Sequence, residues 1–404
     1  MSERIHSPSG PHSAAGFSLV ELLTAMALSL LMFAMTFVLV QQLDNTADVV
    51  GSMSDVNENL RAAVNMVSRD LSQAGENIPL GGIPLPYGGT ATSIKRPYPS
   101  TSTFPTPLSG SALYMPVLIA GNGLGPTQGS GTTQISTDVV SMIGVNQSAS
   151  FNQTVVSTTS PNQPTFSSTS ATITVSTTAA GYVSPGQLVM LRNANSSCLL
   201  AVSSVNATTG VITFTHGDAT NDLLGVNQFP TVSGTTGAIT SGPTSGTILQ
   251  LETATVNSGK TTYAWPTTLT AYPISMMTYY VDSSTPERNL VKLTSMGTNV
   301  CAAVSCTNVV ALGIDVMQVF YSLSPPATLN GVTSDPTENP WPTTTDTTNT
   351  PNDIRKAVLN IVGETNHKNF ANSQWYSKQI RNAVTIQNLD FYNKYNLGSN
   401  MTQN

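Results

Sequence analysis

The chain has 404 residues, of which 9% are charged, and a net charge of −6 at neutral pH. A chain of this length can bury a sizeable core, but charged residues make up about a quarter of an ordinary globular domain. The shortage of charge, with abundant Ser, Thr, Asn, Gly and Pro, favours an exported, loop-rich β protein over a cytoplasmic enzyme. Because phosphate binding needs clustered Lys and Arg, the acidic balance also argues against nucleic acid as a partner.

The N-terminal region combines a short polar leader, residues 1–16, with a long apolar segment, residues 17–40. From Phe17 to Val40 the only charged residue is Glu21. As a helix at about 1.5 Å per residue, this segment is about 36 Å long, which exceeds the roughly 30 Å core of a lipid bilayer. We therefore predict the transmembrane half of a helix at 17–40.

Glu21 is unexpected in a plain membrane anchor. A charged side chain inside a membrane helix costs on the order of 2.5 to 3.5 kcal/mol and usually marks a function with a partner nearby. Cleavage between Gly16 and Phe17 would create an α-amino group one helical turn from Glu21. A carboxylate in the first turn also suits the positive end of the helix dipole. These three residues are therefore the candidate functional residues of the chain.

Gly16, Phe17 and Glu21, within the run Gly-Phe-Ser-Leu-Val-Glu-Leu-Leu, resemble the class III signal of type IV prepilins and type II secretion pseudopilins. The resemblance implies that a prepilin peptidase of the bacterial inner membrane cuts after Gly16 and N-methylates the new terminal Phe17. It also implies that Glu21 docks on the terminal amine of a neighbouring subunit during fibre assembly. The leader departs from the family's positive charge, because Glu3 cancels Arg4, its only Lys or Arg.

Two other interpretations of this N-terminus compete with the prepilin signal. An ordinary secretory signal peptide has small residues after an apolar core of about 7 to 15 residues. Here Ala14, Ala15 and Gly16 precede the apolar run, and the run is longer. A simple single-pass anchor explains the length of the run but neither Glu21 nor the glycine-aromatic junction. The prepilin signal remains a hypothesis drawn from a motif match.

The next segment, residues 41–75, has the pattern of an amphipathic helix. Its apolar residues recur at intervals of three and four, which places them on one helical face. They are Val49, Met53, Val56, Leu60, Ala63, Val64, Val67 and Leu71. Gly75 is the natural stop, so we predict one helix from Phe17 to Ala74, half in the membrane and half packed on a sheet. Residues 59–75 also resemble the second half of this helix in PilW-like minor pilins.

Residues 76–404 are predicted as an exported, β-rich globular domain. We expect long loops at 78–110 and 324–352, because both are rich in proline. Short apolar runs between turn residues predict strands at 138–145, 171–176, 187–191, 198–205, 211–215, 247–256, 274–281, 290–293, 316–321, 357–362 and 383–389. Residues 279–281 and 290–293 are expected to form a hairpin, and a helical turn is expected within 309–315.

The strands between 171 and 215 are predicted to form an inserted antiparallel unit near 171–250. The segments that begin at Asp353 and Arg381 resemble the C-terminal part of PilW-like minor pilins. The expected fold is therefore α+β and pilin-like, with a long N-terminal helix packed on an antiparallel sheet domain that carries inserted β hairpins.

The three cysteines give no metal-site pattern. Cys301 and Cys306 bracket a short loop and are candidates for a local disulfide in an oxidising periplasm. Cys198 is then left as a buried thiol or an alternative partner. None of the three has the CxxC or Cys/His spacing of a zinc site, and we predict neither a metal nor a cofactor.

The sequence also offers no convincing catalytic group. A nucleophilic serine needs a nearby base, and beyond the leader the histidines are His216 and His367, neither in a Gly-x-Ser-x-Gly context. Asp218, Asn221 and Asp222 offer oxygen ligands to calcium but lack EF-hand spacing, so a solvated turn is the commoner explanation. We expect the protein not to be an enzyme.

These observations together predict a minor pilin, PilW-like, that primes a type IV pilus or lies near its tip. The resemblance places it in the inner membrane before assembly, with its C-terminal domain outside, and on the pilus or cell surface afterwards. Its expected partners are the prepilin peptidase and other pilin or pseudopilin subunits. Three alternatives stay open: a minor pseudopilin of a type II secretion system, a pilin-anchored surface binding or adhesion module, and an anchored hydrolase that depends on His216 or His367.

Overall fold

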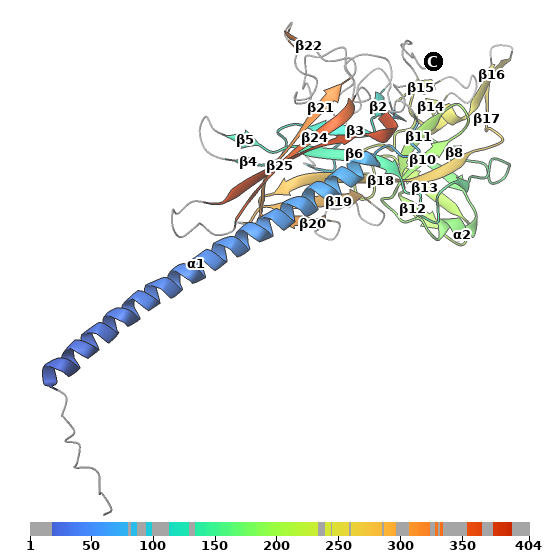
Figure 1. Ribbon diagram of the computed structural model, residues 1–404. Coiled ribbons are helices and arrows are strands. Elements are labelled where there is room, and N and C mark those ends of the chain that lie inside the picture. The colour runs from blue at the N-terminus through green and yellow to red at the C-terminus, as the bar shows by residue number, and fades with distance from the viewer. Residues whose placement is uncertain are drawn as a thin grey trace, which may run out of the picture.

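A long helix projects from a β-rich domain in the computed structural model of the chain (Figure 1). The structure describes residues 18–79, 82–86, 94–98, 113–128, 134–232, 239–243, 245–257, 260–284, 287–295, 307–323, 328–329, 332–333, 354–365 and 375–389. Within this part of the chain, the helix packs on largely antiparallel sheets. The predicted pilin-like α+β fold is confirmed.

Helix α1, Leu19–Ser72, is continuous through both predicted halves. Its 54 residues span about 81 Å at 1.5 Å per residue. Its C-terminal half buries the predicted face, including Leu60, Val67 and Leu71, whereas the apolar N-terminal half touches nothing in the described chain. The helix gives way to a turn in which Gly75 adopts a φ of +78°, and a Cβ there would lie 2.5 Å from Val117. Gly75 therefore acts as the stop that the sequence indicates.

The larger sheet has eight antiparallel strands. Its centre is β18, Thr270–Asp282, which pairs on one side with β10 and β19 and on the other with β6 and β7. The strands around it are β3 (Leu118–Gly121), β6 (Val139–Val145), β7 (Thr154–Val155), β10 (Leu188–Arg192), β11 (Ser197–Ala201), β19 (Asn289–Ser295) and β20 (Thr307–Leu312). The predicted hairpin is confirmed, because Tyr280 pairs with Val291 and Val281 with Leu290.

A second sheet of three antiparallel strands completes the support for α1. It consists of β21 (Ile314–Leu323), β24 (Ile354–Glu364) and β25 (Ser377–Thr385), with β24 in the middle. α1 contacts β24, β25 and β20, and its buried side chains share one core with both sheets. Asp138 joins the sheets, since its backbone N–H donates to Met317 O and its carboxylate accepts from the Val319 and Gly123 N–H groups.

Smaller elements complete the described domain. A four-stranded sheet has the order β12 (Ser204–Asn206), β13 (Val211–Thr215), β9 (Ser170–Thr174) and β8 (Thr165–Phe166). The paired short strands are β1 (Ile83–Leu85) with β2 (Leu113–Met115), β4 (Thr127–Gln128) with β5 (Ile135–Ser136), β14 (Thr231–Val232) with β15 (Ile239–Ser241), β16 (Thr253–Asn257) with β17 (Lys260–Ala264), and β22 (Thr328–Leu329) with β23 (Val332–Thr333). The helical turns are α2 (Thr177–Ala180) and η2 (Ile248–Leu251).

Several local predictions differ from the structure. β10 and β11 lie in the eight-stranded sheet rather than with β9 and β13, because β10 pairs along its whole length with β18. The helical turn expected within 309–315 is instead the strand β20 followed by β21. η2 occupies the start of the strand expected at 247–256, and β1 interrupts the loop expected at 78–110. Pairing with strands distant in the sequence overrides the local pattern in the first two cases.

Glu252, directly after η2, makes the stability of the domain depend on pH. One of its carboxylate oxygens is buried and has no hydrogen-bond partner among the residues that the structure describes, and burial raises its pKa to about 7. The ordinary value is about 4.3, so the folded chain binds the proton more tightly than the unfolded chain. The protonated Glu252 carboxyl therefore stabilises the folded chain relative to the ionised one. This stabilisation is fully present below about pH 4 and is lost as the pH rises through about 7.

Glu252→Gln removes this ionisation. We expect the substitution to raise the Tm of the full mature chain at pH 8 and to change it little at pH 4, as measured by thermal unfolding. The matched control is Glu58→Gln on the exposed face of α1, which should leave the Tm unchanged at both pH values. An equal effect of Glu252→Gln at both pH values would show that burial of the charge is not the cause.

Candidate functional site

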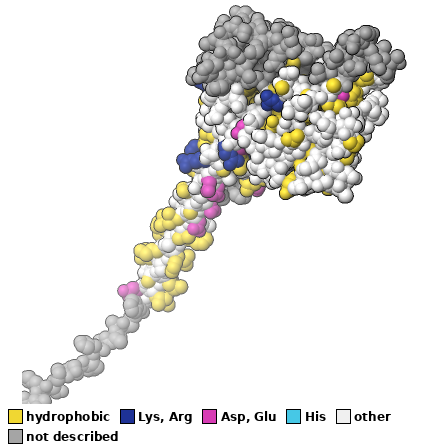
Figure 2. Space-filling view, turned by 90° about the vertical axis from the view of Figure 1, so that its right-hand side faces the viewer, with side chains coloured by type: hydrophobic (Ala, Val, Ile, Leu, Met, Phe, Trp, Pro, Cys, Tyr) yellow, Lys and Arg dark blue, Asp and Glu magenta, His cyan; other side chains and the backbone are white. Residues whose placement is uncertain are grey.

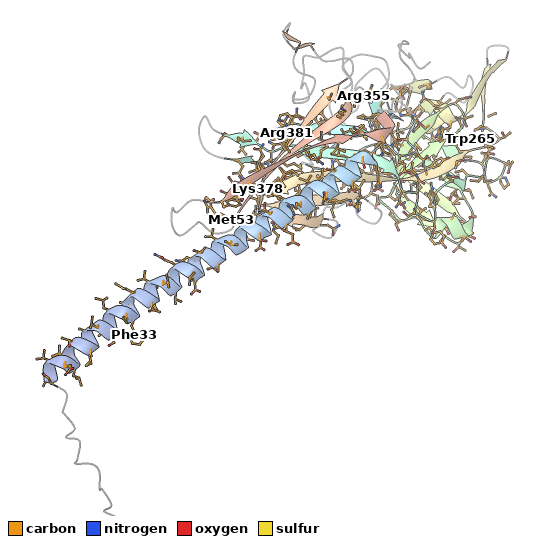
Figure 3. The ribbon with its side chains drawn as sticks, viewed as in Figure 1. Phe33, Met53, Trp265, Arg355, Lys378 and Arg381 are labelled. Atoms are coloured by element: carbon orange, nitrogen blue, oxygen red, sulfur yellow. The ribbon has the colours of Figure 1, made fainter. Side chains whose placement is uncertain are left out.

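The N-terminal half of α1 is an apolar surface without a partner in the described chain. Phe33 projects from the helix far from the β domain (Figure 3) and is 75% exposed. The other apolar side chains from Leu19 to Leu43 are similarly exposed. A contiguous apolar surface of this extent marks a membrane or protein contact, and the helix is long and apolar enough to cross a bilayer. We interpret this half as a single-pass membrane anchor.

Local chemistry explains why this segment is a stable helix in an apolar medium. It is rich in Leu, Ala and Met, which favour helices. The hydroxyls of Thr24, Ser29 and Thr36 donate to backbone carbonyls of the preceding turn, at 3.0, 2.9 and 2.8 Å. A polar group in a bilayer needs such an internal partner. These hydroxyls are therefore satisfied before any second protein binds.

Glu21 is the exception on this surface. It lies in the first turn of α1, where its backbone N–H donates to Ser18 O at 2.9 Å, and its side chain is exposed. It is the only charged residue between Leu19 and Leu43. No ion pair to its carboxylate forms among residues from Ser18 onward that the structure describes. A lone carboxylate on a membrane helix calls for a cationic partner from outside the described chain.

The other residues predicted at the processing site lie outside the described part of the chain. These are Gly16 and Phe17. Because α1 begins at Leu19 and Ser18 is its N-cap, the predicted cleavage point precedes the helix by two residues. Cys301 and Cys306, the predicted disulfide, also lie outside the described residues, and so does His367.

A buried ionic cluster fixes the C-terminal half of α1 to the larger sheet. Asp70 on α1 is 3% exposed, and its Oδ2 accepts hydrogen bonds from the Tyr279 hydroxyl at 2.6 Å and from Lys292 Nζ. Its Oδ1 accepts from Arg69 at 3.2 Å. Tyr279 and Lys292 are direct cross-strand partners on β18 and β19. The sequence interpretation missed this cluster, because it considered only apolar residues for the buried face of the helix.

Burial alone would raise the pKa of the Asp70 carboxyl. The hydrogen bonds from Lys292 and Tyr279, with the charge of Lys292, outweigh that effect and hold the pKa below its ordinary value. Burial and the neighbouring carboxylate raise the pKa of the Tyr279 hydroxyl, which therefore stays a donor. Asp70 is thus ionised at neutral pH and connects the helix to two strands.

The remaining sequence candidates in the described chain are buried or make contacts within the β domain. Cys198 is fully buried on β11, and burial raises the pKa of its thiol, which makes it unreactive. His216 Nδ1 lies 2.7 Å from Asn227 O. The Asp222 carboxylate accepts three backbone N–H groups, from residues 225–227. Among the described residues no group of His, Cys, Asp and Glu is placed to hold a metal ion.

Comparison with known proteins gives one finding. A family model described as the prokaryotic N-terminal methylation motif matches residues 11–37, a stretch that contains Gly16, Phe17 and Glu21. Neither the comparison with curated proteins nor that with solved structures returned a match. The motif, placed at the start of a long apolar helix, supports a type IV pilin-like protein. It implies processing by a prepilin peptidase and assembly with other pilins in a membrane.

Proposed function

We propose that the chain is a structural, non-enzymatic subunit of a type IV pilus, a minor pilin of the PilW-like kind that acts in the priming or tip complex. The observation that carries this proposal is the exposed apolar half of α1 with Glu21 as its single charge, within the matched motif and directly after the predicted cleavage site. Before assembly the chain lies in the inner membrane with its β domain outside. After assembly it lies on the pilus or cell surface.

The proposed mechanism uses three residues. Cleavage after Gly16 frees the amine of Phe17, which the peptidase methylates. In the growing fibre, the Glu21 carboxylate of one subunit pairs with the terminal amine of its neighbour, so both charges are neutralised in an apolar environment. The apolar half of α1 then exchanges lipid for the helices of other subunits, while the C-terminal half stays on the sheets through its buried face.

The same motif and helix serve a minor pseudopilin of a type II secretion system, which is the alternative function. A deletion strain separates the two. We expect loss of surface pili, counted by electron microscopy, with normal secretion of exoproteins, and restoration by the wild-type chain. Normal pili with defective secretion would favour the pseudopilin. Normal pili and secretion with defective binding to surfaces would favour a pilin-anchored adhesion module instead.

A further inference from the structure

A linking segment of α1, residues 44–55, lies between the apolar half of the helix and the half that packs on the sheets. The uncharged run after Glu21 ends at Leu43, and the first buried residue of α1 is Val56. None of residues 44–55 is buried. Figure 2 shows acidic side chains on the helix between its apolar part and the domain. The linking segment therefore has the support of neither a bilayer nor the β domain.

The linking segment consists mostly of residues that disfavour a helix. Ten of its twelve residues are Asp, Asn, Thr, Val, Ser or Gly, and the other two are Ala47 and Met53. Each of these types lowers the statistical weight of the helix about twofold relative to alanine, and glycine lowers it about fivefold. Over the segment these factors multiply to about a thousandfold or more.

Interrupting a helix has an opposing cost of similar size. A second helix must be nucleated, and the nucleation constant is about 10⁻³. In the linking segment the composition offsets most of this cost, so the open form is populated on the order of one per cent or more. The apolar half is held helical by its Leu, Ala and Met content and by the bilayer, and residues 56–72 are held by their buried face.

Local contacts weaken the helix in the linking segment further. The hydroxyls of Thr46 and Ser52 donate to the carbonyls of Gln42 and Asp48, at 2.7 and 2.8 Å. Such contacts compete with the backbone hydrogen bonds of a helix and often bend it. Asp44 and Asp48 carry like charges at a spacing that destabilises a helix. Neither forms an ion pair within the part of the chain that the structure describes.

Gly51 lies in the middle of the linking segment and is the only glycine of α1. A Cβ at this position would meet no atom of the described residues within 4 Å. Close packing therefore gives no reason for a glycine here, in contrast to Gly75, where a Cβ would contact Val117. The property that Gly51 does supply is backbone freedom, which costs helix stability.

We propose that the linking segment is a hinge, in which α1 opens and closes reversibly while the membrane anchor and the packed half stay helical. The closed form is the continuous helix of the structure. The open form lets the β domain tilt relative to the anchor. Opening stops at Val56, because from there the helix is held by its buried face and by the Asp70 cluster. The inference requires the membrane anchor and does not depend on membership of a pilus.

The distance across the linking segment tests the hinge. Positions 43 and 61 are exposed and about five full turns apart, so in a continuous helix they lie on the same side, about 27 Å from each other. A noncanonical amino acid with a spin label replaces each residue in the full chain, which is placed in lipid nanodiscs. We expect pulsed EPR to give a peak near that distance and a second, broad population at shorter distances.

Positions 25 and 43, within the anchor, are the matched control pair. They are also exposed and have the same spacing of about five turns. This pair should give one narrow peak without the broad population. A distribution for positions 43 and 61 as narrow as that of the control pair would overturn the hinge.

Alanine substitutions test the cause of the opening. Thr46, Val50, Gly51 and Ser54 are exposed, and replacing all four with alanine raises the weight of the helix about fortyfold. We expect the broad population between positions 43 and 61 to fall about fivefold or more. Asn65→Ala replaces a poor helix former at an exposed position of the packed half and should leave this population unchanged. An unchanged population in the fourfold variant would also overturn the hinge.

Hydrogen exchange gives an independent measurement on the unlabelled chain. Backbone amides of residues 44–55 should exchange about tenfold faster or more than those of residues 60–71, because local opening exposes them to water. Equal protection of the two stretches would contradict the hinge. Neither measurement involves cleavage after Gly16 or fibre assembly. Failure of the hinge therefore leaves the proposed function intact, and loss of the proposed function leaves the hinge intact.

Discussion

Replacing Glu21 with alanine is expected to leave cleavage after Gly16 largely intact and to reduce incorporation into the fibre about 100-fold. Without the carboxylate, the terminal amine of the neighbouring subunit is unpaired in an apolar environment. A charge in such an environment costs on the order of 2.5 to 3.5 kcal/mol, and each 1.4 kcal/mol is a factor of ten in an equilibrium. The measurement is the ratio of the chain in sheared fibres to the chain in membranes, by quantitative immunoblot.

Thr24→Ala is the matched control for Glu21→Ala. Thr24 lies one turn along the same helix, and its hydroxyl is already satisfied by Glu21 O. We expect this variant to be cleaved and incorporated like the wild type. Normal incorporation of Glu21→Ala would contradict the docking role of the carboxylate.

Replacing Asp70 with alanine is expected to destabilise the fold by about 3 to 5 kcal/mol, the usual cost of breaking a buried ion pair from one side. The substitution leaves Lys292 and the Tyr279 hydroxyl without their shared acceptor in a buried site. The measurement is denaturant unfolding of the full mature chain in detergent. Asp55→Ala on the exposed face of α1 is the control and should cost less than about 0.5 kcal/mol.

The Asp70 cluster also has a pH signature. Because its pKa is lowered in the folded state, its contribution to stability is present above the unfolded value of about 3.9 and is lost as the pH falls through the folded value. Asp70→Ala should therefore lose less stability than the wild type on acidification. The double variant with Lys292→Met should cost less than the sum of the single variants, because they share one interaction. A loss below 1 kcal/mol for Asp70→Ala would contradict this role.

The helix was predictable from the sequence because its signals are local. The uncharged run after Glu21, the three-and-four spacing from Val56 to Leu71 and the stop at Gly75 all act within a few residues of each other. Strands such as β6, β18 and β24 were predictable for the same reason. Membership of a sheet was not, since β10 meets β18 about 80 residues later in the chain, and nothing local encodes that pairing.

The part of the candidate site on the apolar half of α1 was predictable from the sequence. The ionic cluster around Asp70, where α1 meets the larger sheet, was not. Glu21 stands out as a lone charge within a long apolar run. Asp70 was missed because it resembles an ordinary surface charge beside Arg69. The signal that identifies it is its place on the helix, adjacent to the buried Val67 and Leu71, and its partners Tyr279 and Lys292 become visible only when the sheet brings them to the helix.

The N-terminus of the mature protein tests the central claim most directly. The chain is isolated from membranes and from sheared fibres of cells that express it in full, and its first residues are determined by mass spectrometry and N-terminal sequencing. We expect the mature chain to begin at Phe17 with a methyl group on its terminal amine. A mature chain that begins at Met1, or at a site beyond Val40, would contradict the assignment of this N-terminus as a prepilin signal.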